Sequence, residues 1–213
     1  MDVTFCCVLR KLWVLRGLRL RVTIRPRRAI PQAMSKPRIL STSILAQSRL
    51  FRIEALEMAF DAGQRATFEC LRNQGPGVVM VAALDGRDLI LVREYAAGLD
   101  RYELGCVKGK IDEGETPDVT AARELAEEIG YLPGRLDKLR SVTTSPGYSD
   151  FITHLFVARD LRPHSLETGD ELEPLEQVRW PLDRLAALHE HPEVSDARFL
   201  LLLHLIIDLE GNN

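Results

Sequence analysis

The chain has 213 residues, of which 46% are hydrophobic and 28% are charged, and its formal net charge is −3. This length and composition predict a soluble globular protein with one domain, or one domain and an appendage, that can bury its own core. The longest apolar run, residues 199–207, contains a histidine and falls short of the roughly 20 residues that cross a bilayer. We therefore expect no stable membrane insertion.

Charge is distributed unevenly along the chain. Residues 1–33 carry eight Lys or Arg side chains and one acidic side chain, which leaves 20 basic and 30 acidic side chains in the rest. An acidic body excludes a general nucleic-acid-binding surface. The basic extension suits a targeting or membrane-surface segment, but Met34 begins a plausible natural start, MSKPRIL, so we expect residues 1–33 to be disordered or extraneous.

The four cysteines have no zinc-site spacing. They are interpreted as reduced thiols, since disulfides are rare in the cytosol. We therefore expect a cytoplasmic protein.

Residues 34–75 are expected to form an N-terminal strand region. The stretch RLFRIEALEMAF alternates apolar and polar residues, DAGQ (residues 61–64) supplies turn residues, and RATFECLR resumes the pattern. Alternation on both sides of a turn predicts a β-hairpin.

Residues 76–213 are expected to form the main domain. Residues 77–84 and 88–95 are rich in β-formers and flank Asp85-Gly86-Arg87, which is typical of a tight hairpin turn. Further strands are expected at 139–144, 152–161 and 177–180, and helices at 182–191 and 195–209, the last with Ser195 as its N-cap. The pattern predicts a mixed α+β fold with few helices.

One helix is delimited clearly within GKIDEGETPDVTAARELAEEIGY, residues 109–131. Thr116 suits the N-cap, Pro117 the first helical position, and Gly130 the position after the last turn. The helix is expected to span 117–129. Its apolar stripe is expected to comprise Val119, Ala122, Leu125, Ala126 and Ile129.

Three glutamates, Glu124, Glu127 and Glu128, lie off that stripe and converge on one patch of the helix. Such like charges repel by a few tenths of a kcal/mol per pair. A divalent cation bound among them would make the net interaction of the cluster favourable. Magnesium takes oxygen ligands from carboxylates and from substrate phosphates. Arg123 lies close enough to Glu115 through the loop for an ion pair that holds loop to helix. The alternative is a solvated charged helix face.

The stretch matches the pattern G-x5-E-x7-R-E-U-x-E-E-x-G-U, in which U is bulky and apolar, at every fixed position. The matching residues are Gly109, Glu115, Arg123, Glu124, Leu125, Glu127, Glu128, Gly130 and Tyr131. This motif resembles that of the Nudix hydrolases. The flanking segments REYAAGLDRYELGCVKGKIDEGE and EPLEQVRWPL resemble the ADP-ribose pyrophosphatase group of that family, particularly its hydrolases of ADP compounds.

The resemblance implies an α/β/α sandwich with a mixed sheet, preceded by the antiparallel N-terminal strands. It implies that Glu124, Glu127 and Glu128 bind Mg²⁺, with Mn²⁺ as a possible substitute, and that the Gly109 backbone lies close to the metal or phosphate. It also assigns the structural ion pair to Glu115 and Arg123. In the relatives the N-terminal strands contribute to a homodimer, which we expect here as well.

Substrate binding is expected at two upstream residues. Arg93 in REY and Glu103 in ELG resemble substrate-binding positions of the group, although Arg93 also suits a solvent-facing strand end. The segment ELGCVKG has two more residues than the ELPAG of the wider group.

The general base has no candidate in SPGYSDF (residues 145–151), because Phe151 stands where many relatives have glutamate. We therefore place the base in the acidic loop ETGDELEP, residues 167–174. Glu171 is favoured, then Glu173 and Asp170. The alternative is that this loop is merely charged and solvated.

The expected reaction is magnesium-dependent hydrolysis of the pyrophosphate bond in ADP-linked compounds, with release of AMP. ADP-ribose is the first choice of substrate, followed by NADH and diadenosine oligophosphates. Glu127, with Glu171 or Glu173, is expected to be catalytic. The alternative is a non-catalytic Nudix module that binds ADP-ribose or NAD, which three intact glutamates argue against.

Overall fold

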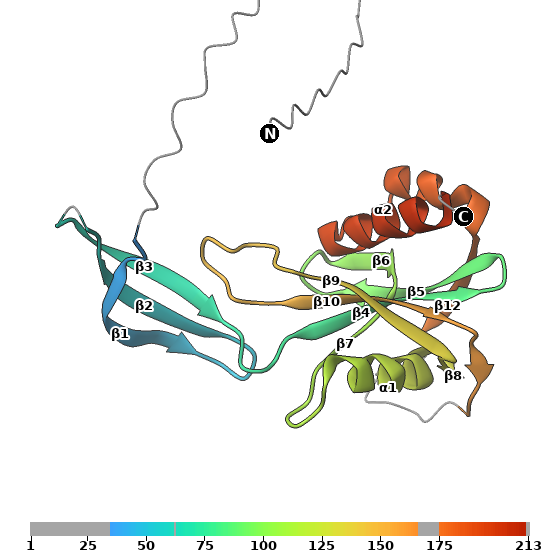
Figure 1. The fold of residues 1–213 in the computed structure, drawn as a ribbon, viewed down its shortest axis with the longest axis horizontal. Coiled ribbons are helices and arrows are strands. Elements are labelled where there is room, and N and C mark those ends of the chain that lie inside the picture. Colours follow the sequence, from blue (N-terminus) through green and yellow to red (C-terminus); the bar gives the residue numbers. More distant parts are fainter. Residues whose placement is uncertain (1–34, 62, 166–174, 212–213) are drawn as a thin grey trace, which may run out of the picture. The chain divides into compact units, whose positions relative to one another are not determined.

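The computed structural model describes residues 35–61, 63–165 and 175–211 (Figure 1). Contacts between residues group the chain into two units, Met1–Lys36 and Pro37–Asn213. The strands and helices described below belong to the second unit. The basic extension 1–33 and the candidate bases Asp170, Glu171 and Glu173 lie outside the described residues.

The N-terminal strands form an antiparallel sheet in the order β1-β2-β3. They span Arg38–Gln47, Arg52–Ala59 and Arg65–Arg72. The predicted hairpin is confirmed as β2–β3, with Arg52 opposite Arg72 and Ala59 opposite Arg65. Strand β1 lies within the expected strand region 34–75, although the sequence pattern did not single it out, and all ten of its residues are exposed.

The main sheet is mixed and has seven strands. These are β4 (Val78–Asp85), β5 (Asp88–Ala96), β6 (Arg101–Gly105), β7 (Val107–Lys110), β9 (Arg135–Val142), β10 (Thr153–Arg159) and β12 (Glu176–Pro181). Their order is β12-β5-β4-β10-β9, with β6 beside β5 and β7 beside β4, and β10 runs parallel to β4. The predicted β4–β5 hairpin is confirmed. Two short strands, β8 (Tyr131–Leu132) and β11 (Arg162–Pro163), pair separately.

Strands β4 and β5 diverge soon after their turn. They pair only over residues 83–85 and 88–90, after which β7 pairs with β4 and β6 pairs with β5. Strands β6 and β7 were not predicted, because four or five residues containing glycine and charged side chains show no clear alternation. The sheet therefore splits into two arms on the side away from the β4–β5 turn.

Helix α1 (Pro117–Ile129) has the predicted ends. Gly130 adopts φ 74°, and its N–H donates to the Ala126 carbonyl at 3.2 Å. Thr116 occupies the N-cap position, although its side chain makes no capping bond. The apolar stripe was partly wrong: Val119 is 52% exposed, and Ala121 is buried in its place.

The C-terminal segment comprises a 3-10 helix, η1 (Leu182–Glu190), and helix α2 (Ala197–Gly211). The predicted N-cap, Ser195, is wrong. The Arg198 N–H donates to Asp196 Oδ1 at 2.8 Å, so Asp196 caps the helix, whereas the Ser195 hydroxyl donates to Glu103 at 2.8 Å. The capping bond is one residue later because Glu103 holds Ser195.

Two helical layers cover opposite faces of the main sheet (Figure 1). Strand β4 is buried on both faces, with Val79, Val81 and Ala83 in the core beside α1 and Met80 and Ala82 in the core beside α2. This arrangement confirms the predicted α+β sandwich with a mixed sheet. Among the described residues, no helix combines the length and apolar character that crossing a membrane requires.

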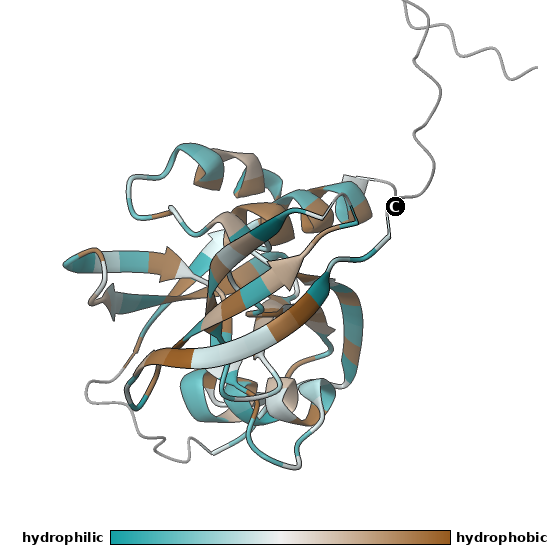
Figure 2. Cartoon of the chain, turned by 90° about the vertical axis from the view of Figure 1, so that its left-hand side faces the viewer, coloured by the Kyte–Doolittle hydropathy of each residue, from teal (hydrophilic) through white to brown (hydrophobic). Residues whose placement is uncertain are grey.

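The N-terminal sheet contributes little to that core. Figure 2 colours the chain by hydropathy and shows hydrophobic bands on its strands. Several of these apolar side chains are at least 40% exposed, namely Ile39, Leu40, Ile44, Leu45 and Phe68. The sheet therefore presents apolar surface that the described part of the chain leaves exposed.

We expect Gly130→Ala to lower the free energy of unfolding by about 1–2 kcal/mol, because a Cβ is disfavoured at a left-handed φ. Urea denaturation measures this change. Gly147→Ala is the control, because a Cβ there meets no atom within 4 Å and its φ is not left-handed. Equal stability of the two variants would contradict the assigned helix end.

Candidate active site

One guanidinium group organises the acidic patch of α1. Arg123 donates from Nε to Glu115 Oε1 at 3.0 Å, and from Nη1 to Glu124 Oε1 at 2.9 Å and Glu127 Oε2 at 2.8 Å. Arg123 also donates to the carbonyl of Lys110 in β7 at 3.3 Å. A single cation thus joins the loop, the helix and the sheet.

Glu115 is held firmly within this network. Arg123, and then the Thr120 hydroxyl at 2.7 Å, bond its carboxylate and lower the pKa of Glu115 to about 2. The structure thus places the two residues expected to form an ion pair in direct contact. The loop 111–116 is fastened to α1 by that contact.

Glu128 lies apart from the guanidinium and is 8% exposed. The Lys108 backbone nitrogen lies 3.4 Å from Glu128 Oε1, while Oε2 is buried and has no hydrogen-bond partner among the described residues. Burial raises the pKa of Glu128 to about 8. A buried carboxylate oxygen without a donor is costly, so a proton, a water molecule or a cation is needed as its partner.

Glu124 occupies the space over a glycine of β7. A Cβ built on Gly109 would overlap the Glu124 carboxylate. Burial raises the pKa of Glu124 to about 6, against the opposing effect of Arg123. A glycine is therefore needed at position 109, because the absence of a side chain there makes room for the Glu124 carboxylate.

Among the described side chains, no three acidic, histidine or cysteine residues already surround a common point as metal ligands do. The reason is visible in the contacts, because Arg123 holds Glu124 and Glu127 toward itself. Two observations nevertheless fit a hard divalent cation: the unpartnered Glu128 Oε2 and the carboxylate cradle over Gly109. The donors are all oxygen atoms, as Mg²⁺ and Mn²⁺ prefer.

Arg93 lies within a cluster of its own. Its guanidinium pairs with Glu193 and, at 3.4 Å, with Glu176, and it lies 5.4 Å from the centre of the Tyr102 ring. Its Nε is buried, and no described residue forms a hydrogen bond with it. The structure thus places Arg93 against protein carboxylates rather than at a free strand end.

Glu103 is tied to the start of α2. Its Oε2 accepts hydrogen bonds from the Ser195 N–H at 3.0 Å and the Ser195 hydroxyl at 2.8 Å, and its Oε1 accepts from Arg101 at 2.7 Å. These bonds lower the pKa of Glu103 despite its burial. No contact of Glu103 with another described residue reaches the acidic patch of α1.

The segment 145–151 is anchored to β3. Asp150 accepts from the Asn73 N–H at 2.7 Å and from Arg72 at 3.2 Å, and the Leu71 N–H donates to the Tyr148 carbonyl at 2.7 Å. Phe151 is half-buried. This segment therefore links the N-terminal sheet to the main domain.

Sequence reasoning missed Lys108 and Glu94, which form an ion pair beside Glu128. The available signal was the longer segment ELGCVKG, in which Lys108 directly precedes Gly109. The segment alone does not show where the Lys108 side chain lies, because strand β7 is too short to be predicted from its sequence.

Comparisons with known proteins agree with this geometry. A NUDIX domain model matches residues 73–202, and a model of the NudE-type Nudix hydrolase N-terminal domain matches residues 37–69. The chain is 42% identical to the ADP compounds hydrolase NudE of Escherichia coli (strain K12), over 82% of this chain and 94% of that protein.

Two further matches extend the comparison. The chain is 30% identical to the ADP-ribose pyrophosphatase of Bacillus subtilis (strain 168), over 75% of this chain and 89% of that protein. A crystal structure of an ADP compounds hydrolase superposes with a TM-score of 0.79 at 39% identity, covering 85% of this chain and 98% of that one. Sequence and fold therefore indicate the same family.

Gly109→Ala should weaken Mn²⁺ binding about tenfold, because the added Cβ displaces the Glu124 carboxylate. We expect the fold to persist, since the obstacle is the end of a flexible side chain. Calorimetric titration with Mn²⁺ and a thermal unfolding curve measure the two effects. In the control Gly98→Ala the Cβ meets no atom within 4 Å, and unchanged Mn²⁺ affinity in both variants would contradict the proposed cradle.

Proposed function

The chain belongs to the Nudix hydrolase family, and on that premise we propose that it hydrolyses the pyrophosphate bond of ADP-linked compounds with the help of a divalent cation. The observation that carries the proposal is the buried Glu128 Oε2, which has no partner, beside Glu124 over Gly109. A divalent cation held by these carboxylates would satisfy that oxygen. The products would be AMP and a phosphorylated remainder.

Glu124, Glu127 and Glu128, with the Gly109 backbone, are the residues that would hold Mg²⁺ or Mn²⁺. When bound, the cation stabilises the charge that develops on phosphate oxygens and lowers the pKa of a water molecule. Arg123 orients Glu124 and Glu127 through two hydrogen bonds. Its ion pair with Glu115 keeps the loop 111–116 in place beside α1.

The positive charge that would bind the diphosphate is assigned to Arg93, whose Nε has no hydrogen-bond partner among the described residues. Binding a phosphate there requires exchange with Glu193 or Glu176, which now neutralise the guanidinium. Glu103 serves the substrate site indirectly, since its carboxylate fixes the start of α2. Glu171 remains the preferred general base, followed by Glu173 and Asp170.

ADP-ribose is the preferred substrate in this proposal, with NADH and diadenosine oligophosphates as the next candidates. The names of the relatives, an ADP compounds hydrolase and an ADP-ribose pyrophosphatase, support this choice. A module that binds ADP-ribose without cleaving it is the competing function. Release of AMP from a panel of ADP compounds distinguishes the two.

We expect Glu127→Gln to lower the turnover number for ADP-ribose by at least about a hundredfold, because it removes one of the charged oxygen ligands. Its fold should remain intact, as judged by the thermal unfolding midpoint. Glu190→Gln, which makes the same chemical change at an exposed position of η1, is the control. Wild-type turnover in Glu127→Gln would remove Glu127 from the catalytic set.

The proposed assembly is a homodimer formed through the N-terminal sheet. Its strands expose apolar side chains that include Ile44 and Leu45, each more than half exposed. Association of two copies would bury that surface.

Light scattering after gel filtration tests this assembly. The wild-type chain should have the mass of a dimer, and Ile44→Asp or Leu45→Asp should shift it to a monomer, since charge is costly in an apolar interface. Leu209→Asp, at a partly exposed position of α2, is the matched control and should stay dimeric. A monomeric wild-type chain would refute the proposed dimer.

A further inference from the structure

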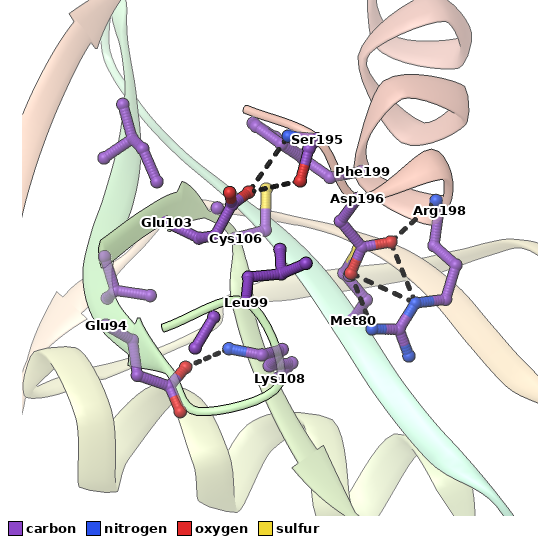
Figure 3. Close-up of a pocket in the computed structure, with 14 residues that line it drawn as sticks. Met80, Glu94, Leu99, Glu103, Cys106, Lys108, Ser195, Asp196, Arg198 and Phe199 are labelled. Carbon is purple, nitrogen blue, oxygen red and sulfur yellow. Dashed lines mark hydrogen bonds and ion pairs between the residues drawn. The ribbon is translucent and has the colours of Figure 1, made fainter. Parts of the chain in front are cut away.

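A cavity of about 430 Å³ lies where the two arms of the main sheet separate. Its walls come from β4, β5, β6 and β7 and from the start of α2 (Figure 3). Cavities of roughly 300–1,000 Å³ are the usual size for small-molecule sites. The volume therefore suits an organic group larger than a single phosphate.

The walls are largely apolar. Met80, Val92, Leu104 and Phe199 are buried, and Leu99 is 55% exposed. Cys106 also belongs to the wall, and burial raises the pKa of its thiol well above the usual range, so the sulfur remains neutral. A lining of this kind favours a flat, weakly hydrated ring over a bare sugar phosphate.

Two ion pairs lie at the cavity wall, and they differ in how firmly their cations are held (Figure 3). Arg198 donates to Asp196 from Nε at 3.0 Å and from Nη2 at 2.6 Å, and it also reaches Thr153 at 3.4 Å. Within the described part of the chain, the Lys108 ammonium group pairs with Glu94 alone. A single ion pair on a flexible lysine can exchange for a phosphate more readily than a bidentate arginine pair.

Lys108 also connects the cavity to the acidic patch. Its side chain lines the cavity, while its N–H donates to Glu128 and the next residue is Gly109. A ligand spanning both places would put its phosphates near Lys108 and Glu128. Glu94, on the neighbouring arm, offers carboxylate oxygens that can accept hydrogen bonds from ribose hydroxyls.

We propose that this cavity binds the nucleoside moiety of the substrate, with Lys108 holding the adjoining phosphate and Glu94 accepting hydrogen bonds from the ribose. The proposal rests on the proposed hydrolysis of ADP compounds and adds the location of one half of the substrate. It assigns Lys108 and Glu94 to substrate binding. The base lies against the apolar wall between β4 and α2.

Gly105 allows the cavity to be filled in steps. It lines the cavity, its φ is not left-handed, and a Cβ there meets no heavy atom within 4 Å. A series of Gly105→Ala, Gly105→Leu and Gly105→Trp should raise the KM for ADP-ribose progressively, to about tenfold or more for the largest side chain. Leu209→Trp adds the same ring outside the cavity and should keep the wild-type KM.

A binding measurement without metal separates the cavity from catalysis. AMP is titrated into the whole protein in the presence of EDTA and followed by calorimetry. The wild-type protein should bind AMP, and Gly105→Trp should lose that binding while keeping the wild-type unfolding midpoint. Ribose 5-phosphate should bind much more weakly, because it lacks the base. Equal binding of AMP by both proteins, or preference for ribose 5-phosphate, overturns the proposal.

Lys108 is tested by comparing AMP with adenosine. Lys108→Met should weaken AMP binding about tenfold and leave adenosine binding unchanged, because the ammonium group contacts only the phosphate. Lys108→Arg should restore AMP binding. Equal losses for AMP and adenosine in Lys108→Met would overturn the assigned phosphate contact.

The failures of the two proposals can be told apart. If the wild-type chain releases AMP and Gly105→Trp does so with an unchanged KM, the cavity proposal fails and the proposed function stands. If the wild-type chain cleaves no ADP compound but binds AMP in EDTA, and filling the cavity abolishes that binding, the proposed function fails and the cavity stands as a nucleotide site.

Discussion

The acidic patch depends on one guanidinium. Three carboxylates within hydrogen-bonding reach of Arg123 would repel each other, and Arg123 neutralises that repulsion while fixing where each oxygen lies. Because Arg123 also reaches the Lys110 carbonyl, the position of the loop, α1 and β7 is set by the same group. Glu128 lies outside the reach of Arg123, and its buried Oε2 has no hydrogen-bond partner among the described residues.

The split of the main sheet turns this patch into part of a larger site. Since β4 and β5 pair over only a few residues, β6 and β7 can enter between them, and β7 brings Lys108 and Gly109 beneath α1. The same divergence opens the cavity bounded by α2. Strand β7, which has four residues, thus joins the carboxylates of α1 on one face of the sheet to the apolar cavity on the other face.

Much of the fold was predictable, because its signals are local. Gly130 ends α1 where a left-handed residue is needed, and the β4–β5 hairpin follows from Asp85-Gly86-Arg87 between apolar runs. The features that were missed depend on tertiary contacts: β6 and β7 are too short to show a period, and Ser195 loses its capping role to a distant partner, Glu103. The motif predicted which glutamates lie together on α1. The ion pair of Lys108 with Glu94 could not be predicted, because it depends on how strands β7 and β5 are placed in space.

Cys106 illustrates how burial controls reactivity in the wall of the cavity. Alkylating and oxidising reagents attack the thiolate, and burial keeps this sulfur protonated at neutral pH. In the closed wall the residue therefore acts as a small apolar side chain, and a cysteine-directed label would spare it as long as β4, β7 and α2 remain packed. Its labelling rate consequently reports how often that packing opens, in a protein that needs no introduced probe.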